Sequence, residues 1–256
     1  MWYPYDELNF ADFSVSFEPA PEDNVTKEIE FLQGVRDFEG RLILEIPIAF
    51  STKTPEFISG RIISLPDNFR PSVNDVLVVD GNYFYGDGRD EILLEIAFAK
   101  HHNLAVGDTV YVKTEEQLKS FEVVGKVISP EYIWPAKNIV EHMPDVLRRW
   151  GVLFMPKSLM EQYFNYTGLI NEVSVLIESS SNLEAVATEV ESVLTPFGVN
   201  KVVTRENQPS NKIIDMMIGS LDSLALVFPI FFLIVAALST YIVLTRMVYL
   251  QARQIG

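Results

Sequence analysis

The sequence predicts an α+β fold: a split β-α-β/β-α-β sandwich subdomain with a mainly β inserted subdomain, followed by a stalk and one transmembrane α-helix. Three observations predict this class. Two β-α-β patterns lie far apart, Pro- and Gly-punctuated β-type runs lie between them, and a long uncharged apolar segment lies near the end. The predicted boundaries are 1–50 and 166–206 for the sandwich, 51–165 for the insertion, 207–223 for the stalk helix, 224–245 for the transmembrane helix and 246–256 for a cytoplasmic segment.

The first β-α-β unit lies near the N-terminus. Residues 13–17 (FSVSF) alternate between apolar and polar side chains as in a strand. Asn24 or Thr26 can cap a helix that runs to about Leu32, and residues 41–50 (RLILEIPIAF) read as a second strand.

The second β-α-β unit lies after the insertion. Residues 172–178 (EVSVLIE) predict a strand, and Ser181 with Glu184 three residues later forms a capping box. An apolar helix face then precedes Gly198 and a strand at 199–204. Together the two units predict one sheet covered by two helices.

The inserted residues are mainly of β type. Only residues 96–102 and 157–164 show a helical pattern there. The predicted strands of the insertion are 76–79, 91–94, 109–113, 121–128 and 152–155.

The apolar segment predicts a membrane span. No residue between Asp222 and Arg246 is charged, and residues 224–244 are long enough for a hydrocarbon core of roughly 30 Å at about 1.5 Å per residue. A buried core helix is the alternative, but such helices usually stop well short of this length. Upstream, an apolar stripe at helical spacing follows Pro209 and predicts a stalk running into the membrane, unless it packs on the domain: Ile213, Ile214, Met217, Ile218, Leu221 and Leu224.

Charge separates the two parts of the chain. The 20 Lys and Arg residues against 35 Asp and Glu residues leave a net charge of −15, which argues against nucleic-acid binding. Beyond Asp222 the only charged residues are Arg246 and Arg253. The positive-inside bias therefore predicts a cytoplasmic C-terminus and an extracytoplasmic location for residues 1–221.

Sequence patterns for catalysis, metals or cofactors are weak. No Gly-x-Ser-x-Gly, His-Glu-x-x-His or Walker-type loop occurs, so we expect no enzyme activity and no cofactor, although a scattered extracytoplasmic active site stays open. His101 and His102 would point about 100° apart on a helix, which favours a surface turn over a metal site. Asp87, Asp90 and Glu91 lack EF-hand spacing and favour a solvated hairpin.

Several motifs occur together in a specific order. They are GNYF at 81–84, EILLEIAFA at 91–99, HNLAVGDTV at 102–110, FEVVG at 121–125 and SPEY at 129–132. Gly107-Asp108 predicts a tight turn between helix and strand, and Gly125 predicts a bulge or a close backbone approach. This order resembles the periplasmic core domain of FtsX/MacB-like ABC transporter permeases, and the closing TRMVYLQARQIG at 245–256 is similar to the stretch after their second membrane helix.

The resemblance implies a permease subunit of an ABC-type transporter or mechanotransmission complex, truncated at both ends. It implies a cytoplasmic ATP-binding subunit as partner, a homodimer or paired permease, and a lipid bilayer. A single-pass receptor or adhesin with an extracytoplasmic ligand-binding domain is the alternative. The residues expected to act are Ile214, Met217, Ile218 and Leu221 in stalk coupling, and Arg246, Arg253, Gln254 and Ile255 near the cytoplasmic partner.

Overall fold

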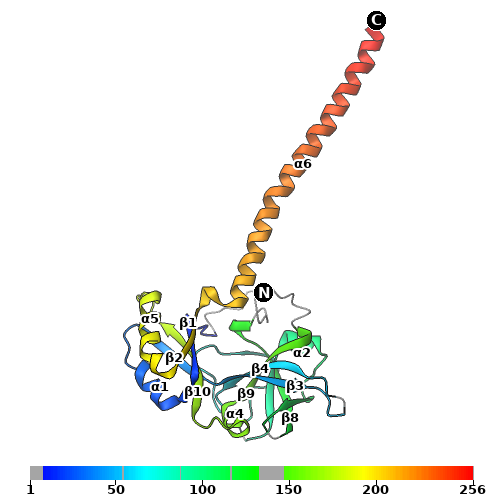
Figure 1. The fold of residues 1–256 in the computed structure, drawn as a ribbon. Coiled ribbons are helices and arrows are strands. Elements are labelled where there is room, and N and C mark those ends of the chain that lie inside the picture. Colours follow the sequence, from blue (N-terminus) through cyan, green and yellow to red (C-terminus); the bar gives the residue numbers. More distant parts are fainter. Residues whose placement is uncertain (1–7, 54, 87, 116, 133–146, 256) are drawn as a thin grey trace. The chain divides into compact units, whose positions relative to one another are not determined.

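The computed structural model describes residues 8–53, 55–86, 88–115, 117–132 and 147–255; of residues 211, 213–227 and 249–255 it describes the backbone alone (Figure 1). The chain divides into two compact units, Met1–Lys212 and Ile213–Gly256. The first unit contains two sheets and the second consists of helix. The α+β class, with two sheets and one C-terminal apolar helix, is confirmed. The finer domain boundaries stay a prediction.

The first sheet is the four-stranded sandwich, in the order β11-β1-β10-β2, with antiparallel neighbours. Helices α1 and α5 cover one face of it, where their apolar sides share a core with Phe13, Val15 and Phe17 of β1. Two helices on one sheet is the arrangement that the two β-α-β patterns predicted. The elements are β1 Phe13–Pro21, α1 Glu22–Ile29, β2 Val35–Arg41, β10 Leu169–Ile177, α5 Leu183–Leu194 and β11 Val199–Thr204.

The second sheet is a barrel in the order β5-β8-β6-β9-β4-β3-β7, and an additional β7–β8 pairing closes it. Its apolar side chains form cores of their own, separate from that of the sandwich. The strands are β3 Ile43–Ala49, β4 Ile58–Leu65, β5 Leu77–Gly81, β6 Glu91–Glu95, β7 Thr109–Lys113, β8 Leu118–Ile128 and β9 Trp150–Pro156, with helices α2 Ile96–His101 and α4 Lys157–Phe164 and the 3₁₀ turn η1 Pro130–Tyr132.

The strand predicted at 41–50 occurs as β3, but its place in the sandwich is wrong, and the sandwich strand β2 was not predicted. The structure has β2 ending at Arg41 and β3 beginning at Ile43, and the two strands belong to different sheets. Leu42 lies fully buried between them, and its backbone N–H donates to Ser64 Oγ over 2.8 Å. A continuous apolar run carries no signal for a change of sheet. Strand β4 was not predicted, because Gly60 and its polar neighbours interrupt its apolar pattern.

The predicted helix caps are also wrong. Helix α1 begins at Glu22 without a side-chain cap; its Glu22 N–H donates instead to the Gly168 carbonyl over 2.9 Å. Helix α5 is capped by Asn182, whose Oδ1 accepts from Ala185 N–H over 3.0 Å, and not by Ser181. Asn182 has the extended backbone that a capping residue needs.

Both glycine predictions are confirmed. Gly107 has a φ of +90°, and Asp108 Oδ2 accepts from Ala105 N–H over 2.7 Å, which forms the expected tight turn. At Gly125 the β6–β8 register shifts, and a Cβ would lie 2.3 Å from the Asn82 carbonyl oxygen. Only glycine permits that approach.

The second unit lies within α6, Pro209–Ile255, which starts at the predicted proline. Among the residues with described side chains, Phe228–Val248 is long and apolar enough to cross a membrane. Its mean hydropathy is 2.2, and none of the stretch is buried against other parts of the chain. The predicted span began at residue 224, and the side chains of 224–227 lie outside the described part.

Glu95 is a buried carboxylate at the start of α2. Its Oε2 accepts from Phe98 N–H over 2.9 Å, so it caps the N-terminus of α2. Burial raises the pKa of Glu95 to about 7, although the backbone hydrogen bonds of Ala97 and Phe98 oppose the rise. The folded barrel therefore holds a proton here that the unfolded chain releases at lower pH.

Glu95→Gln should stabilise the protein at alkaline pH and have little effect in acid. Between the unfolded and folded pKa values the folded state binds the extra proton, so wild-type stability falls as pH rises toward 7 and stays lowered above it. We expect the variant to gain up to about 3 kcal/mol at about pH 8 and almost nothing at about pH 5. Denaturation of the full chain in detergent at both pH values measures this.

Glu189→Gln on the exposed side of α5 is the matched control and should change stability at neither pH. An equal gain for Glu95→Gln at both pH values would contradict the buried-proton explanation.

Candidate functional site

The sandwich face without helices carries a row of polar side chains. Since Phe13, Val15 and Phe17 point into the core with α1 and α5, the serines between them point to the opposite face. Ser16 lies in register with Lys201 on β11 and with Glu172 on β10, and Glu172 lies in register with Arg41 on β2. One row thus crosses all four strands and faces the barrel.

Arg41 joins the two sheets. The residue is 1% exposed, and its guanidinium donates to Glu131 of η1 through Nη1 to Oε2 over 2.5 Å and through Nη2 to Oε1 over 2.9 Å. Nη2 also pairs with Glu172 of the sandwich. We call these three residues the Arg41 clamp. A bidentate arginine–carboxylate pair fixes the orientation of the two side chains as well as the distance between them.

Electrostatics keep Arg41 charged. Burial lowers the pKa of Arg41, but the carboxylates of Glu131 and Glu172 outweigh burial and raise it well above its ordinary value. Burial raises the pKa of Glu172, and Arg41 opposes that rise. Among the described residues, Arg41 Nε is buried without a hydrogen-bond partner. The clamp stabilises its charges only while the arginine is present.

Two further contacts link the sheets. The Asn171 side chain of β10 pairs with the backbone of Ile43 on β3, accepting from its N–H and donating to its carbonyl, both over 2.8 Å. Lys157 of α4 pairs with Glu22 of α1. The sandwich and the barrel therefore meet through polar contacts at several points.

The barrel side presents a second ion pair. Arg61 Nε donates to Glu45 Oε1 over 2.7 Å, and its guanidinium lies 5.5 Å from the Trp150 ring centroid. Arg61 Nη1 also donates to the hydroxyl of Tyr132 over 3.3 Å. Burial raises the pKa of Tyr132 to about 12, against the effect of Arg61.

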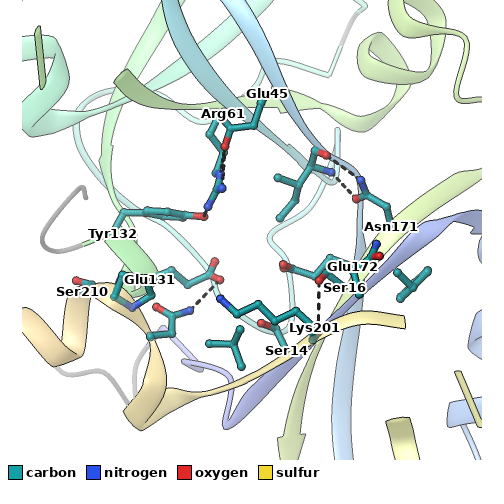
Figure 2. A pocket seen from close by; sticks show the side chains of 16 residues that line it. Ser14, Ser16, Glu45, Arg61, Glu131, Tyr132, Asn171, Glu172, Lys201 and Ser210 are labelled. Carbon is teal, nitrogen blue, oxygen red and sulfur yellow. Dashed lines mark hydrogen bonds and ion pairs between the residues drawn. The ribbon is translucent and has the colours of Figure 1, made fainter. Parts of the chain in front are cut away.

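A pocket of about 360 Å³ lies between these groups. Figure 2 shows the Glu45–Arg61 pair and Tyr132 on one side, and Asn171, Glu172 and Lys201 on the other. We call it the inter-sheet pocket. Its remaining lining residues are Ser14, Ser16, Phe17, Ile43, Glu131, Asn200, Val203, Gln208, Pro209 and Ser210.

The pocket includes the beginning of α6. Pro209 is the first residue of that helix, and Ser210 is 2% exposed. The preceding Gln208 donates through Nε2 to Glu131 Oε1 over 3.4 Å, the same oxygen that binds Arg41. The residue just before α6 thus has a direct hydrogen bond to the clamp.

The site residues expected from the sequence lie elsewhere and stay predictions. Arg246 lies exposed on α6. The others belong to α6 by backbone, with side chains outside the described part: Ile214, Met217, Ile218, Leu221, Arg253, Gln254 and Ile255.

Sequence reasoning missed Arg41, Glu131 and Glu172. The available signal was a charged residue beside or within a strand pattern, since Arg41 directly precedes an apolar run and Glu172 lies within one. His102 is also not a simple surface residue: its ring packs 4.7 Å from the rings of Phe50 and Phe98.

Replacing Arg41 should be strongly destabilising. Arg41→Met leaves two buried carboxylates without their cation, and we expect a loss of about 3–5 kcal/mol in the free energy of unfolding. Without Arg41 the pKa of Glu172 rises further, so the folded variant takes up protons and its deficit should shrink from about pH 7 to about pH 5. Denaturant titration of the full chain in detergent gives both values.

Lys126→Met removes the partly exposed Lys126–Asp80 pair and serves as the control, with an expected loss below about 1 kcal/mol. If both variants lose the same free energy of unfolding, the Arg41 clamp contributes no more to stability than a surface ion pair.

No family model and no curated protein matches the chain. Among solved structures, it is similar to the extracellular domain of the noncanonic ABC-type transporter YknZ from Gram-positive bacteria, at 14% identity and a TM-score of 0.47, covering 74% of this chain and 99% of that one. It is also similar to the periplasmic region of MacB from Actinobacillus actinomycetemcomitans, at 11% identity and a TM-score of 0.48, covering 84% and 96%. The chain is thus distantly similar to extracytoplasmic domains of ABC-type permeases.

Proposed function

We propose that this chain is the membrane subunit of an ABC-type transporter or mechanotransmission complex. One observation carries the proposal: the helix whose first residues line the inter-sheet pocket is also the helix that contains the apolar stretch Phe228–Val248. An element shared by a polar junction and a membrane-spanning stretch is suited to pass movement between them. The motif order from 81 to 132 and the closing Ile-Gly support the same function.

In this proposal a separate cytoplasmic subunit hydrolyses ATP and displaces the C-terminal end of α6. The displacement reaches Pro209, and through the Gln208–Glu131 hydrogen bond it reaches the Arg41 clamp. A change at the clamp alters how the sandwich and the barrel are held against each other. The chain itself performs no chemistry in this scheme.

The expected residues have defined roles in the proposal. Ile214, Met217, Ile218 and Leu221 couple the stalk, in register with the helical repeat. Arg246, Arg253, Gln254 and Ile255 lie on the cytoplasmic side, next to the ATP-binding subunit, and the protein acts as a homodimer or paired permease. Residues 1–221 lie on the extracytoplasmic side of the cell membrane.

A receptor or adhesin is the second candidate function. The observation that favours it is the inter-sheet pocket itself, which is lined by charged groups from both sheets. The two functions differ in the partner they require, because only the permease needs an ATP-hydrolysing subunit.

The orientation can be tested with single cysteines, because the chain has none of its own. With a membrane-impermeant maleimide on spheroplasts, Asn200→Cys should be labelled at once and Gln254→Cys only after permeabilisation. Asn200 is exposed on the first unit, and Gln254 lies at the end of α6. The reverse pattern would overturn the proposed topology.

Coupling can be tested by insertions after Ser220 in the full-length protein, purified from native membranes. We expect an ATP-hydrolysing protein to copurify, and ATP to change the maleimide labelling rate of Asn200→Cys. A poly-glycine insertion should abolish the ATP effect, whereas a poly-alanine insertion of equal length should retain it, since alanine preserves helix and glycine does not.

If ATP still changes labelling after the glycine insertion, force does not pass along α6. Absence of any ATP-hydrolysing partner would favour the receptor instead.

A further inference from the structure

Three groups that face the inter-sheet pocket have unused hydrogen-bonding capacity. Ser14 is 8% exposed and lines the pocket, yet among the described residues its hydroxyl has no hydrogen-bond partner. In the same part of the chain, the ammonium of Lys201 has no ion pair, and Glu172 uses Oε1 for Arg41 and has no partner at Oε2. Lys201 is exposed and Glu172 is partly buried, so the hydroxyl, the ammonium and the carboxylate oxygen are all accessible to a ligand in the pocket.

The three groups lie close together on one sheet face. Lys201 and Glu172 are the cross-strand neighbours of Ser16 on either side, and Ser14 is two residues along the same strand. Ser16 donates to the backbone carbonyl of Lys201 over 3.3 Å, which links the two strands at this point. Figure 2 shows the Lys201 side chain extending across the pocket, beside Ser14 and Ser16.

Charge narrows the class of ligand. A simple anion would meet Lys201 and the Ser14 hydroxyl but would lie near the carboxylates of Glu131 and Glu172. A simple cation would meet Glu172 but would lie near Lys201 and Arg61. A molecule that carries both charges satisfies both sides, with its carboxylate on Lys201 and Ser14 and its ammonium on Glu172.

We propose that the inter-sheet pocket binds a small zwitterion, such as a free amino acid or the backbone of a short peptide. A volume of about 360 Å³ is at the small end of typical ligand pockets and fits a compound of that size. Because groups from both the sandwich and the barrel line the pocket, the bound molecule would also hold the two sheets together.

The test is calorimetric titration of the full chain in detergent with glycylglycine. We expect binding that weakens at least about tenfold when the ligand is N-acetylated or C-amidated, because each change removes one charge-assisted contact. Lys201→Met and Ser14→Ala should weaken binding as well, the lysine variant by at least about tenfold. Lys27→Met, an exposed lysine on α1, is the matched control and should bind as wild type.

Absence of glycylglycine binding would overturn the proposal, as would equal affinity of wild type and Lys201→Met. If the acetylated dipeptide binds as well as glycylglycine, the site takes anions and the zwitterion proposal is wrong. Circular dichroism confirms that each variant is folded. Because the titration requires neither ATP nor movement of α6, its failure leaves the proposed transport function untouched.

Discussion

The architecture of the first unit depends on one buried arginine. Arg41 ends β2 in the sandwich and holds Glu131 of the barrel and Glu172 of the sandwich with the same guanidinium. Removing three charges from water is costly, and the cost is offset only when each charge has its partner. The relative placement of the two sheets is therefore sensitive to this contact, whereas each sheet has an apolar core of its own.

Polar contacts between the sandwich and the barrel affect how the two sheets respond to movement. Between the sandwich and the barrel lie ion pairs and hydrogen bonds, such as Asn171 to Ile43, beside one small buried apolar cluster of Ala11, Val73 and Leu176. Ion pairs and hydrogen bonds are directional, so a small shift at Gln208 would alter the geometry at Glu131. Such sensitivity to small shifts is expected of a junction whose geometry changes when α6 moves or when a ligand binds.

The proposed transport function and the proposed zwitterion site use the same pocket for different reasons. Transport requires that the start of α6 contacts the junction, and Pro209 and Ser210 supply that contact. Ligand binding requires groups that are available to a ligand, and Ser14 and Lys201, whose side chains have no partner among the described residues, supply those. A ligand that binds one arrangement of the sheets better than another would shift the population between them, whatever drives α6.

The sequence by itself determined the features that depend on neighbouring residues: the second β-α-β unit, most strands of the barrel, the Gly107 and Gly125 positions, the start of α6 and its apolar stretch. Local patterning suffices there, because periodicity and turn chemistry act over a few residues. Only the tertiary structure decided the change of sheet at Leu42 and the Arg41 clamp, whose partners lie 90 and 131 residues away along the chain. Such pairings arise from how complete sheets meet, and no short pattern of residues encodes them.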